Sequence, residues 1–159
     1  MLGVLSNSSG RADTVSAAID VFAASGVGLV VHCGDVGGRH VLDQLARLGG
    51  VFVWGDRDTD RMGLLRYGHS IGVDCFGLMG NFDWEEKKIC VIHGEDKKVV
   101  RRILDEQQYD YLLIGHELST EDKTVGRTRV INPGAIFGGS TPSAVVLDPT
   151  NGKLRVLPL

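Results

Sequence analysis

The chain has 159 residues, of which 43% are hydrophobic and 23% are charged. This length and composition predict a single domain, residues 1–159, with its own hydrophobic core. The net charge of −3 argues against a broad basic surface for nucleic acid. We expect neither a signal peptide nor a membrane span, because no apolar run is long enough. The three cysteines lie in apolar runs, which indicates reduced core thiols and a cytoplasmic protein: Cys33, Cys75 and Cys90.

Short apolar runs alternate with helical patterns through the first third of the chain. Strands are expected at 2–5, 28–32 and 51–54, with a helix after each of the first two. This alternation predicts parallel pairing through βαβ units. The residues expected on the apolar faces of the two helices are Val15, Ala18, Ile19 and Phe22, and then Val41, Leu42, Leu45 and Leu48.

The second half is richer in antiparallel signals. Residues 57–70 are polar and contain glycine, which predicts a loop or short helix over the site. The rest of the expected elements are a hairpin of 73–82 with 88–92, a helix at 96–107, a strand at 111–114, a weak strand over 124–131, a turn at 132–134, and a hairpin of 144–147 with 154–157.

Four of the apolar runs end beside a glycine in a carboxylate or an imidazole. The four side chains are those of Asp35, Asp56, His93 and His116. Ligands of open α/β sheets collect at the carboxyl ends of strands, so we expect these side chains to converge. Two imidazoles and two carboxylates favour manganese, zinc, iron or nickel over calcium or magnesium. Taken singly, each residue also fits a structural role, as a turn aspartate or a hydrogen-bonded core histidine.

The polar stretch 7–10 precedes the first expected helix. Its side chains suit helix capping, and its backbone N–H groups could instead hold an anion. Capping is the favoured interpretation, and the Gly-Lys-Ser/Thr signature of a Walker loop is absent.

The order of these motifs resembles the calcineurin-like metallophosphoesterase family, in particular its small single-domain phosphodiesterases. The likeness extends from Gly3 to about Leu157. It implies an α/β fold, an αββα sandwich of two mixed β-sheets flanked by helices, with a two-metal site that hydrolyses phosphate esters. The segments that carry it are Gly34-Asp35, Gly55-Asp56-Arg57-Asp58, His93-Gly94, Gly115-His116 and Asn132-Pro133-Gly134.

One of the two metal positions that the resemblance implies has lost its ligands. The family's Asp-X-His and the second histidine of its Gly-His-X-His are replaced here by Asn7, Ser9 and Leu118. Leucine cannot bind a metal, and the other two are weak neutral ligands. The other position keeps Asp35, Asp56, His93 and His116, so the resemblance implies a single divalent transition ion: manganese, zinc, iron or nickel.

The resemblance also assigns roles. Arg57 stands where family enzymes often have a phosphate-contacting histidine, and a solvated loop side chain is the equal alternative. The expected catalytic residues are Asp35, His93 and Arg57. Asp58 would steady this loop or cap the turn at Arg61.

Three functions follow from this interpretation. The first is weak metal-dependent hydrolysis of phosphodiesters, with a phosphate ester or another anion as ligand. The second is an inactive binding or scaffold protein, as is the retromer subunit of this fold, which also has Gly-Asp-X-Asp at the third motif. The third is an anion or nucleotide sensor. A protein partner and a homo-oligomer stay open.

Overall fold

The strand–helix alternation of the N-terminal third builds the first of two β-sheets. The computed structural model describes all residues, 1–159. In this sheet, β1 (Leu2–Leu5), β2 (Leu29–His32), β3 (Gly50–Phe52) and β4 (Val73–Cys75) run parallel, as the βαβ pattern predicts. The sheet is extended beyond β1 by an antiparallel hairpin of β10 (Ser143–Asp148) and β11 (Lys153–Pro158).

The second sheet has five strands in the order β5-β6-β7-β9-β8. Pairing is antiparallel in the two hairpins, β5 with β6 and β8 with β9, and parallel between β6, β7 and β9. The sheet is therefore mixed. Its strands are β5 (Met79–Trp84), β6 (Lys87–Ile92), β7 (Tyr111–Ile114), β8 (Thr120–Val125) and β9 (Thr128–Pro133).

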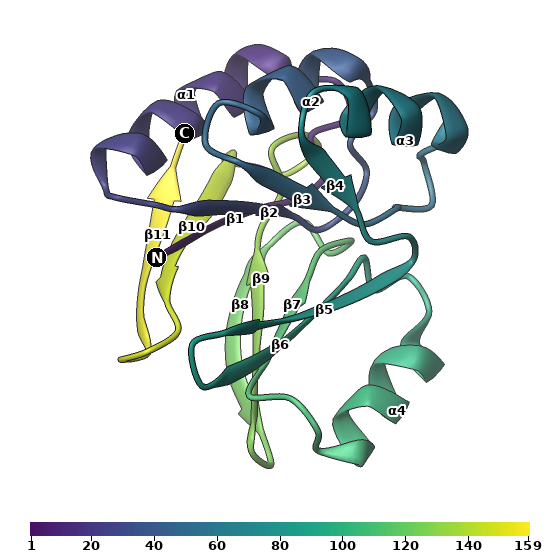
Figure 1. Cartoon of the computed structure of the whole chain (residues 1–159). Helices are drawn as coiled ribbons and strands as arrows, with labels where there is room; N and C mark the ends of the chain where they lie inside the picture. Colours follow the sequence, from purple (N-terminus) through teal and green to yellow (C-terminus); the bar gives the residue numbers. More distant parts are fainter.

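Helices cover the outer face of each sheet (Figure 1). Three of them, α1 (Ala12–Ala24), α2 (Arg39–Leu45) and α3 (Arg61–Ser70), lie over the first sheet, and α4 (Lys97–Glu106) lies against the second. All four residues predicted on the inner face of α1 are fully buried, and Leu48, beyond α2, is half-buried. The layers are therefore helices, sheet, sheet and helix, as the sandwich prediction requires.

The strands of the first sheet are apolar on both faces because both faces are buried. Val4 and Val31 face the second sheet, whereas Leu5 and Val30 face the helices. Gly3 lets α1 approach closely, since a Cβ atom there would lie 2.5 Å from the ring of Phe22. Because both faces of the sheet are packed, the positions of the strand ends are fixed. The positions of the loops that follow the strands are fixed with them.

Several predicted elements were wrong in detail. Residues 73–82 do not form one strand: Gly77, with φ +76°, breaks the run, so that β4 pairs in the first sheet and β5 in the second. Within the predicted loop or short helix of 57–70, residues 61–70 do form a helix, but it packs beside α2 and does not cover the site. Its two glycines hid the pattern, although Asp60 caps it by accepting a hydrogen bond from the Gly63 N–H.

Two further boundaries were misplaced. The weak strand at 124–131 is two strands, because a turn at Gly126, with φ +61°, separates β8 from β9. Strand β9 extends through Asn132 and Pro133, so the predicted turn overlaps the end of the strand, and a proline is tolerated there. The turn itself forms as an Asx turn, in which Oδ1 of Asn132 accepts from the N–H of Gly134, with φ +78°.

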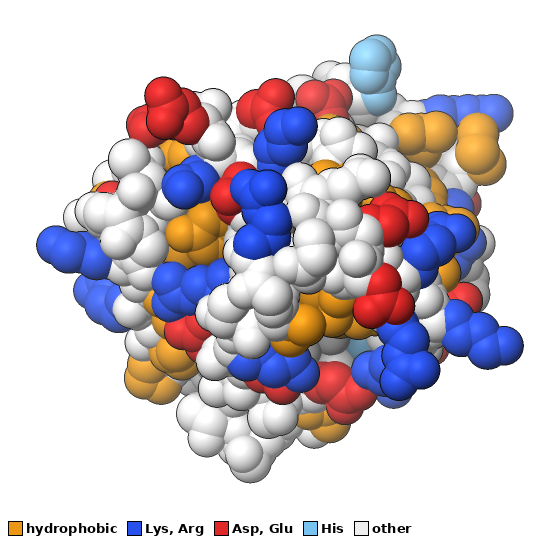
Figure 2. All heavy atoms as spheres, turned by 90° about the horizontal axis from the view of Figure 1, so that it is seen from below, with side chains coloured by type: hydrophobic (Ala, Val, Ile, Leu, Met, Phe, Trp, Pro, Cys, Tyr) orange, Lys and Arg blue, Asp and Glu red, His pale blue; other side chains and the backbone are white.

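The surface carries charges of both signs, and the cysteines are unpaired. Figure 2 shows acidic and basic side chains interspersed on the face seen from below. No helix of the structure is long and apolar enough to cross a membrane. Cys33 and Cys90 are buried, as predicted, whereas Cys75 is only half-buried, and all three are free thiols. Burial raises the pKa of Cys90 to about 12.

Candidate metal centre

The four predicted ligands all lie in loops at the carboxyl ends of strands. Asp35 follows β2, Asp56 follows β3, His93 follows β6 and His116 follows β7. Because β2 and β3 belong to one sheet and β6 and β7 to the other, the site lies where the two sheets meet. Asp35 and His116 adopt left-handed backbone conformations, with φ +59° and +66°. Such strain in residues other than glycine is typical of functional sites.

Three of these side chains present ligand atoms to one point. Nitrogen or oxygen atoms of Asp56, His93 and His116 all lie within 4.8 Å of one another. Oδ1 of Asp56 is 3.1 Å from Nε2 of His93 and 3.6 Å from Nδ1 of His116. Asp35 stands outside this trio, but its Oδ1 lies 3.6 Å from Nε2 of His93. His93 is thus the residue that both carboxylates share.

These spacings are compatible with ligation of a transition ion. Ligand bonds of about 2.0–2.1 Å in tetrahedral geometry hold the ligand atoms roughly 3.3 Å apart. The separations of 3.1 Å and 3.6 Å among the acidic oxygens and histidine nitrogens bracket that value. The donor set of imidazole and carboxylate is the set expected for zinc, manganese, iron or nickel.

The hydrogen bonding of His93 fixes which ring nitrogen faces the centre. Nδ1 lies 2.7 Å from the carbonyl oxygen of Cys33, and a carbonyl only accepts, so Nδ1 carries the proton. In the neutral ring, Nε2 then presents a lone pair toward the oxygens of Asp35 and Asp56. Facing lone pairs repel unless a cation or a second ring proton lies between them. This backbone contact is also the outer interaction that orients a metal-binding histidine.

The two carboxylates differ in their surroundings. Asp35 is 2% exposed, and burial raises its pKa, although the Arg57 N–H and the charge of His93 act in the opposite direction. Burial also acts to raise the pKa of Asp56, but a backbone hydrogen bond and the two histidines outweigh it, and the pKa is lowered. Burial therefore opposes ionisation of Asp35, whereas the hydrogen bond and the histidines favour ionisation of Asp56.

Asn7 occupies one ligand position of the second ion that the resemblance implies, and its side chain is already engaged. Its Nδ2 donates to the carbonyl oxygen of His116 at 3.2 Å, and its Oδ1 accepts from the His116 N–H at 3.2 Å. The Ser6 hydroxyl donates to the same oxygen at 2.6 Å. Asn7 thus clamps the backbone of a candidate ligand.

The other two residues of that position are Leu118 and Ser9. Leu118 is 45% exposed and apolar. Ser9 has a buried hydroxyl without a hydrogen-bond partner and a backbone φ of +45°. The loop that carries Leu118 is held by Asn132, whose Nδ2 donates to the carbonyls of Gly115 and Glu117. Sequence reasoning missed this anchoring role of Asn132, since the motif was interpreted as a turn.

The predicted capping role of the 7–10 stretch is wrong. The residue that caps α1 is Arg11, and no side chain caps the helix. The hydroxyl of Ser8 instead donates to the carbonyl of Val36 at 3.0 Å and lies 2.7 Å from Nε2 of His32. The side chains of this stretch therefore bond to residues of other loops at the site. They do not bond to the free N–H groups at the start of α1.

His32 is a buried titratable group beneath the site. Since the Ser8 hydroxyl uses its proton on Val36, it accepts from Nε2–H of His32, whose Nδ1 has no partner. Burial lowers the pKa of His32 to about 4, and the nearby charge of Asp58 offsets only part of that shift. The ring is therefore neutral at pH 7.

This lowered pKa predicts a loss of stability in acid. Between pH 6.5 and pH 4 the unfolded chain binds a proton at His32 that the folded chain does not, so stability falls as the pH falls. The full loss is about 3 kcal/mol. Urea unfolding at pH 7 and pH 4.5 measures it. A His32→Asn variant should lose clearly less stability over the same interval, and parallel losses in the two proteins would contradict this assignment.

Asp58 joins the two loops that carry the carboxylates. It is 4% exposed. Its Oδ2 accepts from the N–H groups of Asp35 and Gly55, and its Oδ1 accepts from that of Gly37, at 2.9–3.0 Å. Of its two predicted roles, steadying the loop is the one that the contacts support. Asp60 is the residue that caps α3.

Arg57 lies at the rim of the centre. Its backbone N–H donates to Oδ1 of Asp35 at 3.0 Å, and its Nε lies 3.8 Å from Oδ2 of the same residue. The side chain is 67% exposed, so the guanidinium is free to meet a ligand.

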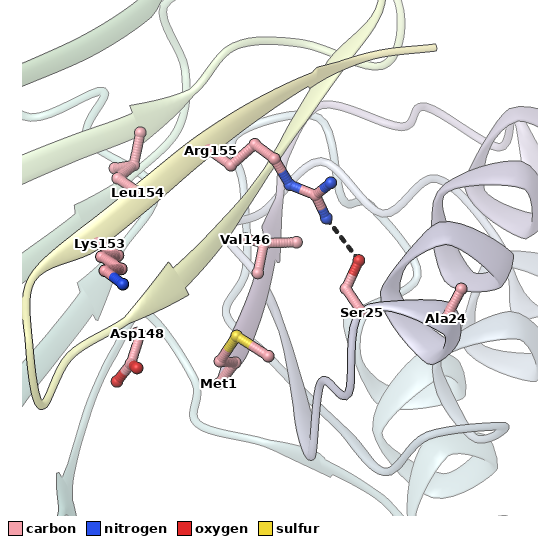
Figure 3. Close-up of a pocket in the computed structure, with 8 residues that line it drawn as sticks. All are labelled: Met1, Ala24, Ser25, Val146, Asp148, Lys153, Leu154 and Arg155. Carbon is pink, nitrogen blue, oxygen red and sulfur yellow. Dashed lines mark hydrogen bonds between the residues drawn. The ribbon is translucent and has the colours of Figure 1, made fainter.

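A hollow at the opposite end of the first sheet shares no lining residue with the metal centre. Figure 3 shows it between Met1, the end of α1, and the β10–β11 hairpin, with a volume of about 560 Å³. Arg155 donates to the Ser25 hydroxyl across it. Its lining contains no histidine or cysteine. Choosing a candidate site by the volume of the hollow alone would therefore miss the candidate metal ligands.

The chain is similar in sequence to a known family and to a characterised relative. The sequence model of the calcineurin-like phosphoesterase superfamily domain matches residues 1–152. The phosphodiesterase MJ0936 of Methanocaldococcus jannaschii is 24% identical over 165 residues, which cover 99% of this chain and 98% of that protein.

Solved structures show the same architecture. A structure described as a novel archaeal phosphodiesterase superposes with a TM-score of 0.92 at 22% identity, covering 99% of both chains. Wild-type Vps29 of Entamoeba histolytica, complexed with zinc, gives 0.64 at 17% identity and covers 99% of this chain and 97% of its own. These likenesses confirm the αββα fold predicted from the sequence. With residues 1–152 matched by the family, the chain belongs to the calcineurin-like phosphoesterase superfamily.

Proposed function

We propose that the chain is a metal-dependent phosphodiesterase that works with one transition ion. The observation that carries this proposal is the hydrogen bond from Nδ1 of His93 to Cys33, which leaves Nε2 facing two carboxylates. Asp35, Asp56, His93 and His116 would hold a divalent ion, whose charge would remove that repulsion. Bound there, the ion supplies positive charge to a phosphoryl group and activates the attacking water.

The second ion position is proposed to be lost. Both polar atoms of the Asn7 side chain are bonded to the His116 backbone, so neither is available as a ligand. Leu118 adds no donor. With one ion, less charge is available to stabilise a phosphoryl transition state, so weak turnover is expected. The preference for diesters follows the relative in Methanocaldococcus jannaschii, which is a phosphodiesterase.

The chain's own residues would position the ester. Asp35 is held by the Arg57 N–H and by the loop that Asp58 secures, and it orients the attacking water. The exposed guanidinium of Arg57 would hold two oxygens of the phosphate in a bidentate contact. His93 keeps Nε2 directed at the centre through Cys33.

Hydrolysis of bis-p-nitrophenyl phosphate by protein loaded with Mn²⁺ or Zn²⁺ tests this function. We expect slow hydrolysis that EDTA removes. Bound metal with no hydrolysis of any ester would contradict an enzyme and favour a scaffold. Vigorous turnover would contradict the loss of one ion position.

A prediction for Arg57 follows. Arg57→Ala should reduce kcat/KM for this diester by about 10- to 100-fold, because a bidentate charge-assisted contact is lost. Metal content should stay unchanged, since Arg57 is a cation and holds no metal. Arg57→Lys should recover only part of the loss, because an ammonium group cannot form the bidentate contact. Full activity in Arg57→Ala would contradict the phosphate contact and show that Arg57 is a solvated loop side chain.

A further inference from the structure

A second hollow adjoins the metal centre on the side of Arg57. It has a volume of about 230 Å³ and only one hydrophobic lining residue. We call it the arginine pocket, and its lining residues are Gly37, Gly38, Arg39, Arg57, Asp58, Thr59, Asp60 and Leu64. The space beside Gly38 is open, since a Cβ atom at that position would meet nothing within 4 Å. The pocket has room for a phosphate group together with part of the molecule that carries it.

The two guanidinium groups of the arginine pocket are at most weakly paired within the chain. Arg39 makes no ion pair, and the nearest carboxylate to Arg57 lies 3.8 Å from its Nε. Arg39 is also held in place, since its guanidinium lies over the ring of Tyr67 at 5.3 Å. The Tyr67 hydroxyl in turn donates to Asp43. A cation ordered before binding loses less entropy when an anion arrives.

The two acidic residues of the lining are already committed to backbone donors. Both oxygens of Asp58 accept N–H groups of the surrounding loops. Asp60 accepts the Gly63 N–H and caps α3. The arginines therefore keep guanidinium donors for a ligand, whereas Asp58 has both oxygens engaged and Asp60 has Oδ1 engaged. The pocket as a whole is suited to an anion.

The arginine pocket and the metal centre share one wall. Arg57 lines the pocket, and its backbone N–H donates to Asp35 of the centre. We propose that the arginine pocket binds a second phosphate group of the substrate, apart from the phosphate that is cleaved. This inference rests on the proposed function and narrows it to substrates with two phosphate groups joined by a short spacer.

Two matched esters test the proposal. One is the p-nitrophenyl ester of thymidine 5′-phosphate, and the other is the same ester with an additional 3′-phosphate. The bisphosphate should be hydrolysed with a kcat/KM about tenfold higher, because charge-assisted contacts to Arg39 are added. In Arg39→Gln this ratio should fall toward one. Arg66→Gln, at an exposed arginine of α3 outside the pocket, should leave the ratio unchanged.

A binding measurement separates this inference from the proposed function. Calorimetry on the metal-free protein should show tighter binding of thymidine 3′,5′-bisphosphate than of thymidine 5′-phosphate, and Arg39→Gln should remove the difference. Equal affinities together with equal kcat/KM values would overturn the pocket proposal alone. If neither ester is hydrolysed by metal-loaded protein, the proposed function fails, and the calorimetric difference still decides the pocket.

Discussion

Replacing His93 with alanine should lower the affinity for Mn²⁺ by at least about 100-fold and reduce diester hydrolysis to the background rate. His93 is the one side chain within 3.6 Å of both candidate carboxylates. It is also fully buried and locked by its bond to Cys33, so no neighbouring group can replace it. Removing it leaves Asp35 and Asp56 without the nitrogen that completes the ligand set.

The matched control for this variant is His40→Ala. His40 is an imidazole with a 91% exposed side chain, 3.6 Å from Asp43, and it is not one of the candidate ligands. The His40→Ala variant should bind Mn²⁺ with the same affinity as the unaltered protein. Titration with Mn²⁺ followed by calorimetry measures both affinities. An unchanged affinity in His93→Ala would show that the ion binds elsewhere or that the cluster is only structural.

Replacing Asp58 with alanine should lower the free energy of unfolding by about 3–5 kcal/mol and the Tm by about 10 °C. The carboxylate is buried and accepts three backbone N–H groups, from Asp35, Gly37 and Gly55. Alanine leaves all three donors without a partner in a place with little access for water. The left-handed backbone of Asp35 also loses a contact that holds it, so metal affinity should fall with stability.

Asp60→Ala is the matched control, because Asp60 also accepts a backbone N–H but at the exposed start of α3. A lost helix cap costs about 1 kcal/mol. Urea unfolding of the two variants without metal compares them directly. Equal small losses would mean that water or loop movement satisfies the donors around position 58, and the clamp assigned to Asp58 would be wrong.

The sequence allowed the sandwich and the metal trio to be predicted for physical reasons that are local. The inner face of α1 repeats with helical period, and the apolar runs of β1, β2 and β7 are bounded by polar residues and glycine. Asp56, His93 and His116 were identified by their position at strand ends, and the fold gathers them within 4.8 Å of one another.

The parts that could not be predicted depend on partners distant in the sequence. Asn7 bonds to His116, 109 residues away, and nothing near Asn7 signals that contact. Asp58 reaches across 23 residues to Asp35, so the local pattern could not decide between steadying the loop and capping a turn. The passage of the chain from one sheet to the other at Gly77 was missed because β4 and β5 are short and nearly continuous.

Metal analysis at saturation tests the main claim most directly. The protein is stripped of metal, dialysed against excess Mn²⁺ or Zn²⁺, and its ion content is measured per chain. We predict one ion per chain, which is lost in His93→Ala. Two ions per chain would show that Asn7, Ser9 and Leu118 do not close the second position, and a chain that retains none would contradict the centre itself.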